Sequence, residues 1–101
     1  MDLNLAGKTV IVTGGGSNIG RAIVLAFASE KSRVVIADID EFQGQKVAKK
    51  VNTLGGKAIV IKTDVTDMSS VTAMVKRIIE EFGKLDVLVN SVGWTLDRLF
   101  I

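Results

Sequence analysis

The sequence predicts an α/β fold in which a doubly wound parallel sheet is covered by helices on both faces. Short apolar runs recur along the chain, and segments with helical spacing separate them. The apolar runs are mostly continuous rather than alternating, as expected for parallel strands buried on both faces. Right-handed crossovers favour the strand order 3-2-1-4. We expect one domain over residues 1–101.

Four apolar runs are the predicted strands. They span Val10 to Val12, Val34 to Ala37, Ala58 to Ile61 and Leu85 to Val89, the last with Asp86 interposed. A first helix is predicted to begin near Asn18. The apolar residues expected to face the sheet from this helix are Ile19, Ala22, Ile23, Ala26 and Phe27.

Two further helices are predicted between the later strands. Asp40 is a candidate N-cap for the middle helix, with Gln43 placed for a capping box, while Gly44 weakens the helical pattern. Asp67 and Gly83 are the expected cap and stop of the last helix. The predicted apolar stripes are Phe42, Val47, Val51 and Leu54 in the middle helix, and Met68, Val71, Met74, Val75, Ile78 and Phe82 in the last.

Composition excludes several classes of function. The chain has no cysteine and no histidine, which removes disulfides, thiolate chemistry and the usual ligands of a metal site, and it has no tyrosine. The net charge of +2 comes from scattered residues, so we expect no nucleic-acid partner. No apolar run approaches the roughly 20 residues of a membrane span, and the N-terminus lacks a signal pattern, so we expect no membrane association and a cytoplasmic location.

The segment VIVTGGGSNIG joins the first predicted strand to its helix through glycines. The unpaired N–H groups of a helix start and the positive end of its dipole attract anions, and glycines let a pyrophosphate approach the backbone. A plain tight turn is the alternative. A P-loop is disfavoured because Arg21 and Ala22 follow Gly20, and the pattern Gly-x-Gly-x-x-Gly fails because position 19 is Ile19.

The spacing of Thr13, Gly14, Ile19 and Gly20 instead resembles the loop of the short-chain dehydrogenase/reductase family, Thr-Gly-x-x-x-Gly-x-Gly. Asn18 stands where that pattern has its middle glycine; asparagine tolerates left-handed backbone better than most residues. The resemblance implies a Rossmann-type nucleotide-binding sheet and an oxidoreductase that interconverts a secondary alcohol and a ketone.

Asp38 ends the second predicted strand, 18 residues after Gly20, where dinucleotide folds place an acid that binds the adenosine ribose. The 2′-phosphate of NADP would meet this carboxylate; two like charges about 4 Å apart repel by about 4 kcal/mol at an effective dielectric constant of about 20. Ser17 and Ile39 supply no compensating arginine. NAD is therefore the expected cofactor and NADP the less favoured one. A purely capping role for Asp38 is the alternative.

Two later strand ends continue the resemblance. It implies that Asp64 and Val65 line the adenine pocket, although Asp64 is also typical of a solvated turn. Asn90 and Gly93 match the family's Asn-Asn-Ala-Gly, whereas Ser91 and Val92 do not. The full set of candidate cofactor-binding residues is Gly14, Ser17, Asn18, Ile19, Gly20, Asp38, Ile39, Asp64, Val65, Asn90, Val92 and Gly93.

The family's catalytic residues are not found in this sequence. Its serine and its Tyr-x-x-x-Lys would lie beyond residue 101, so we name no catalytic residue and expect the chain to be the N-terminal part of a longer, incomplete fold, with the apolar strand at 85–89 left as an open edge. The resemblance also implies a small-molecule substrate and a homo-oligomer in the full-length form. With Trp94, Leu99 and Phe100, the chain also resembles members of the family that act on hydroxyacyl thioesters or cyclic alcohols. A non-catalytic nucleotide-binding module is the alternative function; methyl transfer is disfavoured by the loop spacing.

Overall fold

The computed structural model describes residues 6–14, 16 and 18–90. Strands and helices alternate along this part of the chain. Their bounds are β1 Thr9–Thr13, α1 Asn18–Ser29, β2 Arg33–Asp38, α2 Glu41–Thr53, β3 Lys57–Lys62, α3 Met68–Phe82 and β4 Val87–Asn90. The predicted alternation of strands and helices is thus confirmed.

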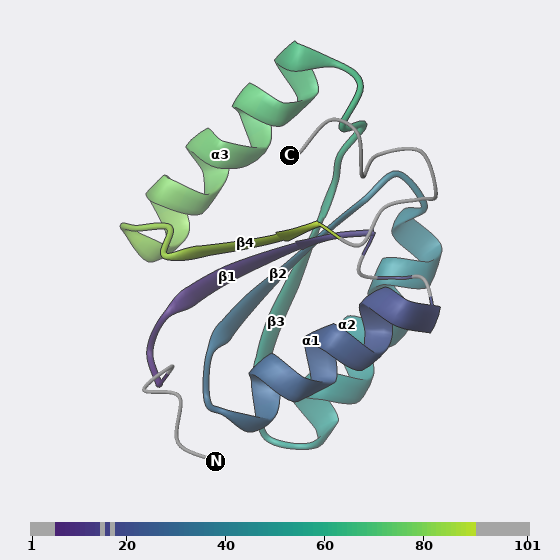
Figure 1. The fold of residues 1–101 in the computed structure, drawn as a ribbon, viewed down its shortest axis with the longest axis vertical. Helices are drawn as coiled ribbons and strands as arrows, with labels where there is room; N and C mark the ends of the chain where they lie inside the picture. The colour runs from purple at the N-terminus through teal and green to yellow at the C-terminus, as the bar shows by residue number, and fades with distance from the viewer. Residues whose placement is uncertain (1–5, 15, 17, 91–101) are drawn as a thin grey trace.

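The four strands form one parallel sheet in the order β3-β2-β1-β4, as predicted. Figure 1 shows α1 and α2 together on one face of the sheet and α3 on the other. Strand β1 lies between β2 and β4, and all five of its residues are buried. Strand β4 is an edge of the described sheet, where Leu88 is 58% exposed.

The alternation of side chains along the strands divides the core into two layers. Val10, Val34 and Val60 face α1 and α2. Ile11, Val35 and Ile61 face α3, where Met74 and Ile78 cover them. Both faces of the central strands are therefore apolar, which explains why their sequences read as continuous apolar runs.

The predicted apolar stripe of α1 was partly wrong. Ile23 and Phe27 do pack against the core, but Ile19 is 71% exposed and Val24, outside the predicted stripe, is fully buried. The spacing did not decide the side, because Val24, Leu25 and Ala28 are apolar residues that lie outside the predicted stripe and pack in the core. The contact with the sheet selects the side that carries Val24.

The stripe of α2 was also partly wrong. Val47 and Val51 are buried, but Phe42 and Leu54 are 66% and 72% exposed. Gly44, and not an apolar side chain, faces the sheet near the start of α2. A Cβ at this position would lie 2.9 Å from Cγ1 of Val60. The glycine lets the helix approach β3 closely.

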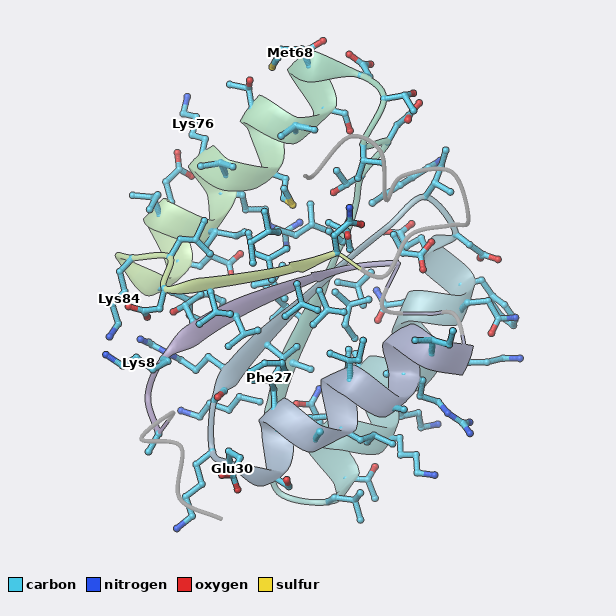
Figure 2. All side chains as sticks on the ribbon, viewed as in Figure 1. Lys8, Phe27, Glu30, Met68, Lys76 and Lys84 are labelled. Atoms are coloured by element: carbon cyan, nitrogen blue, oxygen red, sulfur yellow. The ribbon has the colours of Figure 1, made fainter. Side chains whose placement is uncertain are left out.

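The predicted N-caps of α2 and α3 and the predicted stop of α3 are confirmed. The capping box expected at α2 is not formed, because the N–H of Asp40 donates to Oδ1 of Asp38 and not to the Gln43 side chain. The carboxylate of Asp40 accepts a hydrogen bond of 3.1 Å from the N–H of Gln43, and Asp67 accepts one of 3.0 Å from the N–H of Ser69. Gly83 ends α3 in the left-handed conformation, with a φ of 78°. Met68, predicted as part of the α3 stripe, is 79% exposed and lies at the outer end of the helix (Figure 2).

Strand β4 begins at Val87, two residues later than the predicted run. Before this strand, Asp86 is bonded to Thr9 through both its side chain and its backbone. Oδ2 of Asp86 accepts a 2.8 Å hydrogen bond from the N–H of Thr9, and the N–H of Asp86 donates to the Thr9 carbonyl at 3.0 Å. The Thr9 N–H, and to a lesser degree Lys84, lower the pKa of the Asp86 carboxyl. Asp86 thus joins the beginnings of β1 and β4.

No helix in residues 6–14, 16 and 18–90 combines the length and the apolar character needed to cross a membrane. The cytoplasmic location stays a prediction.

Ile78→Ala tests the α3 face of the core. Ile78 is fully buried and α3 is the one described helix on its face, so we expect the free energy of unfolding to fall by about 2–5 kcal/mol. The neighbouring Ile79 is 46% exposed, and Ile79→Ala should cost less than about 1 kcal/mol. Urea unfolding of both variants measures the difference, and equal losses would contradict this packing.

The lowered pKa of Asp86 gives a pH prediction. Its folded-state pKa lies below the unfolded value, so its contribution to stability is present above about pH 4 and is lost as the pH falls through the folded-state pKa. Asp86→Asn should therefore show a smaller loss of stability than wild type between about pH 5 and about pH 3. Urea midpoints at the two pH values measure this loss. The control Glu80→Gln removes an exposed carboxylate of α3 and should behave like wild type.

Candidate nucleotide-binding site

The parallel strands bring their carboxyl ends to one edge of the sheet. Thr13 of β1 is the register partner of both Ala37 of β2 and Asn90 of β4, and Asp38 is the partner of Lys62 of β3. In open α/β sheets, ligands bind outside this edge, where connections run to opposite faces. The described sheet has such a point between β1 and β4, because α1 covers one face and α3 the other.

Gly14 turns the chain as it leaves β1. Its φ is 69°, which favours glycine, and its N–H donates a 2.8 Å hydrogen bond to the carbonyl of Ala37. The turn carries the chain toward the end of β2 before α1 begins at Asn18. The positive end of the α1 dipole therefore lies beside the glycine loop.

Gly16 is a site residue that the sequence analysis did not select. Its N–H donates a 2.9 Å hydrogen bond to Oδ2 of Asp38. A Cβ on this residue would lie 2.8 Å from the same oxygen and 3.0 Å from both Cβ of Gln43 and the backbone N of Gly44. The run of three glycines could have identified Gly16. The family pattern, however, includes only Gly14 and Gly20 of the glycines in this loop.

Asp38 is not the cap of α2. Asp40 performs that role through Gln43, while Oδ1 of Asp38 accepts a 2.9 Å hydrogen bond from the N–H of Asp40. The alternative that Asp38 only caps α2 is therefore wrong. Ile39 lies beside it and is 60% exposed.

Lys62 of β3 is the residue opposite Asp38 in the strand ladder. Its backbone is the register partner of Asp38, yet no ion pair joins the two side chains among the described residues. The carboxylate charge is therefore not neutralised by direct contact with an ammonium group.

Asp64 lies in the turn after β3. Its Oδ1 accepts hydrogen bonds from the N–H and Oγ1 of Thr66, at 2.9 and 2.6 Å, and these bonds lower its pKa. In residues 6–14, 16 and 18–90, no donor reaches its Oδ2. The expected role of Asp64 in the turn is thus observed for Oδ1, and Oδ2 accepts no hydrogen bond from the described residues. Val65 beside it is half-buried.

The turn after β3 is tied to the end of β2. The N–H of Thr63 donates a 3.0 Å hydrogen bond to the carbonyl of Asp38, and the N–H of Asp64 donates a 2.9 Å bond to Oγ of Ser70 in α3. The structure therefore brings Asp38 and Asp64 to adjacent strand ends, as predicted.

Asn90 joins β4 to β1 at the same edge. Its Oδ1 accepts a 2.8 Å hydrogen bond from the hydroxyl of Thr13. At the start of α1, Ile19 is exposed and Gly20 is buried. The remaining candidates, Ser17, Val92 and Gly93, lie outside the described residues, as do Trp94, Leu99 and Phe100.

Two hollows of the surface lie away from this edge. One, of about 640 Å³, follows β3 and α2; the other, of about 610 Å³, lies at the amino edge of the sheet and includes Lys31 and Lys57. These lysines come after α1 and α2, where positive side chains offset the negative ends of the helix dipoles. Neither hollow includes Gly14, Gly16 or Asp38. Among the described residues, no group of three or more His, Cys, Asp or Glu could hold a metal ion.

Comparison with known proteins places the chain among oxidoreductases. Residues 8–100 match the family model described as short chain dehydrogenase. An uncharacterized oxidoreductase of Thermotoga maritima is 45% identical over 89 residues, which are 88% of this chain and 35% of the relative. The 7alpha-hydroxysteroid dehydrogenase of Escherichia coli is 36% identical over 91% of this chain and 36% of its own.

Solved structures agree with the sequence matches. A hydroxysteroid dehydrogenase from Escherichia coli superposes with a TM-score of 0.86 at 36% identity, covering 89% of this chain and 38% of that one. An NAD+-bound xylitol dehydrogenase gives a TM-score of 0.85 at 33% identity, covering 89% and 35%. The chain therefore spans a little more than a third of the length of these relatives.

Thr13→Val tests the connection between β1 and β4. Valine keeps the shape of threonine but removes the hydroxyl that donates to Oδ1 of Asn90, and the loss of this hydrogen bond costs about 1 kcal/mol. We expect amide hydrogen exchange in β4 to rise about fivefold. Thr13→Ser keeps the hydroxyl and is the control; an equal rise in both variants would contradict a role for this hydrogen bond.

Proposed function

Because the chain belongs to the short-chain dehydrogenase family, we propose that the carboxyl edge of its sheet binds NAD. We further propose that the chain is the cofactor-binding part of an oxidoreductase that interconverts a secondary alcohol and a ketone. The observation that carries the proposal is the carboxylate of Asp38, which ends β2 and is hydrogen-bonded to the glycine loop.

The glycine loop fits the phosphates of a dinucleotide. Gly14 and Gly16 bring backbone close to the end of β2 without side chains, and α1 starts directly after the loop with the positive end of its dipole. A pyrophosphate carries negative charge that such a helix start stabilises. Ile19 and Gly20 in the first turn of α1, and Ser17 in the loop, would border these phosphates.

Asp38 fits the adenosine ribose of NAD better than that of NADP. Each of its oxygens accepts one N–H and can still accept a ribose hydroxyl through its remaining lone pairs. A 2′-phosphate would instead meet a like charge that no described ion pair neutralises. Asp64 at the neighbouring strand end would take the adenine amino group through its Oδ2.

NAD, once bound, supplies the hydride acceptor, and the protein supplies binding and orientation. The chain contains no tyrosine and no histidine, so we propose that the proton partner for the alcohol comes from residues beyond these 101. The names of two relatives, a hydroxysteroid dehydrogenase and a xylitol dehydrogenase, support an alcohol as the substrate class.

The selectivity of binding tests this proposal. In the complete natural polypeptide containing this chain, we expect NADH to bind at least about tenfold more tightly than NADPH, because about 1.4 kcal/mol of the repulsion suffices for that ratio. Asp38→Ala should weaken NADH binding and strengthen NADPH binding, since the 2′-phosphate then meets no carboxylate at the end of β2. The fluorescence of the reduced nicotinamide or calorimetry measures both affinities.

Asp67→Ala is the matched control for Asp38→Ala. It removes the same charge from the N-cap of α3 and should lower stability without changing the ratio of the two affinities. Equal or tighter binding of NADPH by the wild-type protein would contradict the role of Asp38.

A further inference from the structure

We infer that Gly16 is a positioning residue for cofactor selectivity, because its backbone N–H fixes the carboxylate of Asp38 in the orientation that receives the ribose. This inference rests on the proposed binding of NAD and deepens it. It assigns a role to the third glycine of the run, which neither the family spacing nor the turn at Gly14 explains.

The carboxylate of Asp38 is held at two points. Oδ2 accepts the N–H of Gly16 and Oδ1 accepts the N–H of Asp40, each at 2.9 Å. Donors on different oxygens fix both the direction and the plane of the group. Charge-assisted hydrogen bonds of this kind are stronger than neutral ones, so the carboxylate is oriented before a ligand arrives.

A side chain at position 16 would be crowded in this arrangement. A Cβ would lie 2.8 Å from Oδ2 of Asp38 and 3.0 Å from the backbone N of Gly44, which belongs to the first turns of α2. The backbone N of Gly44 is held by its hydrogen bond to the Asp40 carbonyl, whereas the carboxylate of Asp38 is the end of a side chain and can turn away. We therefore expect a side chain at position 16 to displace the Asp38 carboxylate from the loop.

Separation of the loop from Asp38 affects the two cofactors differently. NADH loses an oriented acceptor for its ribose hydroxyls, so its affinity falls. The affinity for NADPH rises, because the carboxylate that repels its 2′-phosphate is no longer held in place. A change that only loosens the fold would weaken both affinities by the same factor, so the ratio of the affinities reports the positioning role.

The test compares two alanine variants of the complete natural polypeptide. Gly16→Ala is expected to weaken NADH binding about tenfold and to lower the preference for NADH over NADPH by at least that factor. Gly56→Ala is the control: its Cβ would lie 2.8 Å from Cγ1 of Val51, an equally tight contact at the opposite edge of the sheet. It should lower the unfolding temperature and leave the cofactor preference unchanged.

The contact itself is tested without cofactor. In the wild-type protein, the amide proton of Gly16 should resonate downfield because it donates to a carboxylate, and Asp38→Ala should shift this resonance upfield. This measurement decides the question if Gly16→Ala does not fold. A Gly16 amide that does not respond to Asp38 would overturn the inference.

The outcomes separate the two proposals. Failure of the wild-type protein to bind NADH contradicts the proposed function. Wild-type binding of NADH with an unchanged NADH to NADPH ratio in Gly16→Ala overturns the role of Gly16 alone.

Discussion

The burial of β1 on every side is the constraint on which the rest of the structure depends. The strand is paired with β2 on one edge and β4 on the other, and all five of its residues are buried. Val10 and Val12 contribute to one layer of the core and Ile11 to the other. No side chain of this strand is available for binding. The polar groups that this segment offers to a ligand therefore follow Thr13, at the carboxyl edge of the sheet.

The geometry of that exit explains the glycines. Gly14 directs its N–H to the end of β2, and Gly16 reaches the carboxylate that ends the same strand. Helix α2 begins immediately after this carboxylate, so the loop is packed between the end of β2 and the start of α2. A Cβ at position 16 would crowd the end of β2 and the first turns of α2.

Much of the fold could be predicted from the sequence. The strand order, the alternation of elements and the caps at Asp40 and Asp67 followed from local patterns, and all are confirmed. The face of α1 that contacts the sheet could not be predicted, since several spacings fit and the choice depends on packing. Phe42 and Leu54 were misplaced because Gly44, by its lack of a side chain, sets how α2 contacts β3.

The candidate site was predicted less completely than the fold. Asp38 could be identified because it directly follows an apolar run, and Asp64 because it comes three residues after the next one. The structure places both at adjacent strand ends. Gly16 was missed, since a hydrogen bond between residues 22 positions apart leaves no local pattern. Hydrogen–deuterium exchange with and without NAD tests the account most directly. We expect NAD to protect the segments 13–20 and 37–40 at the carboxyl edge. Protection confined to the hollow around Gly55 and Lys57 at the amino edge, or no protection, would contradict it.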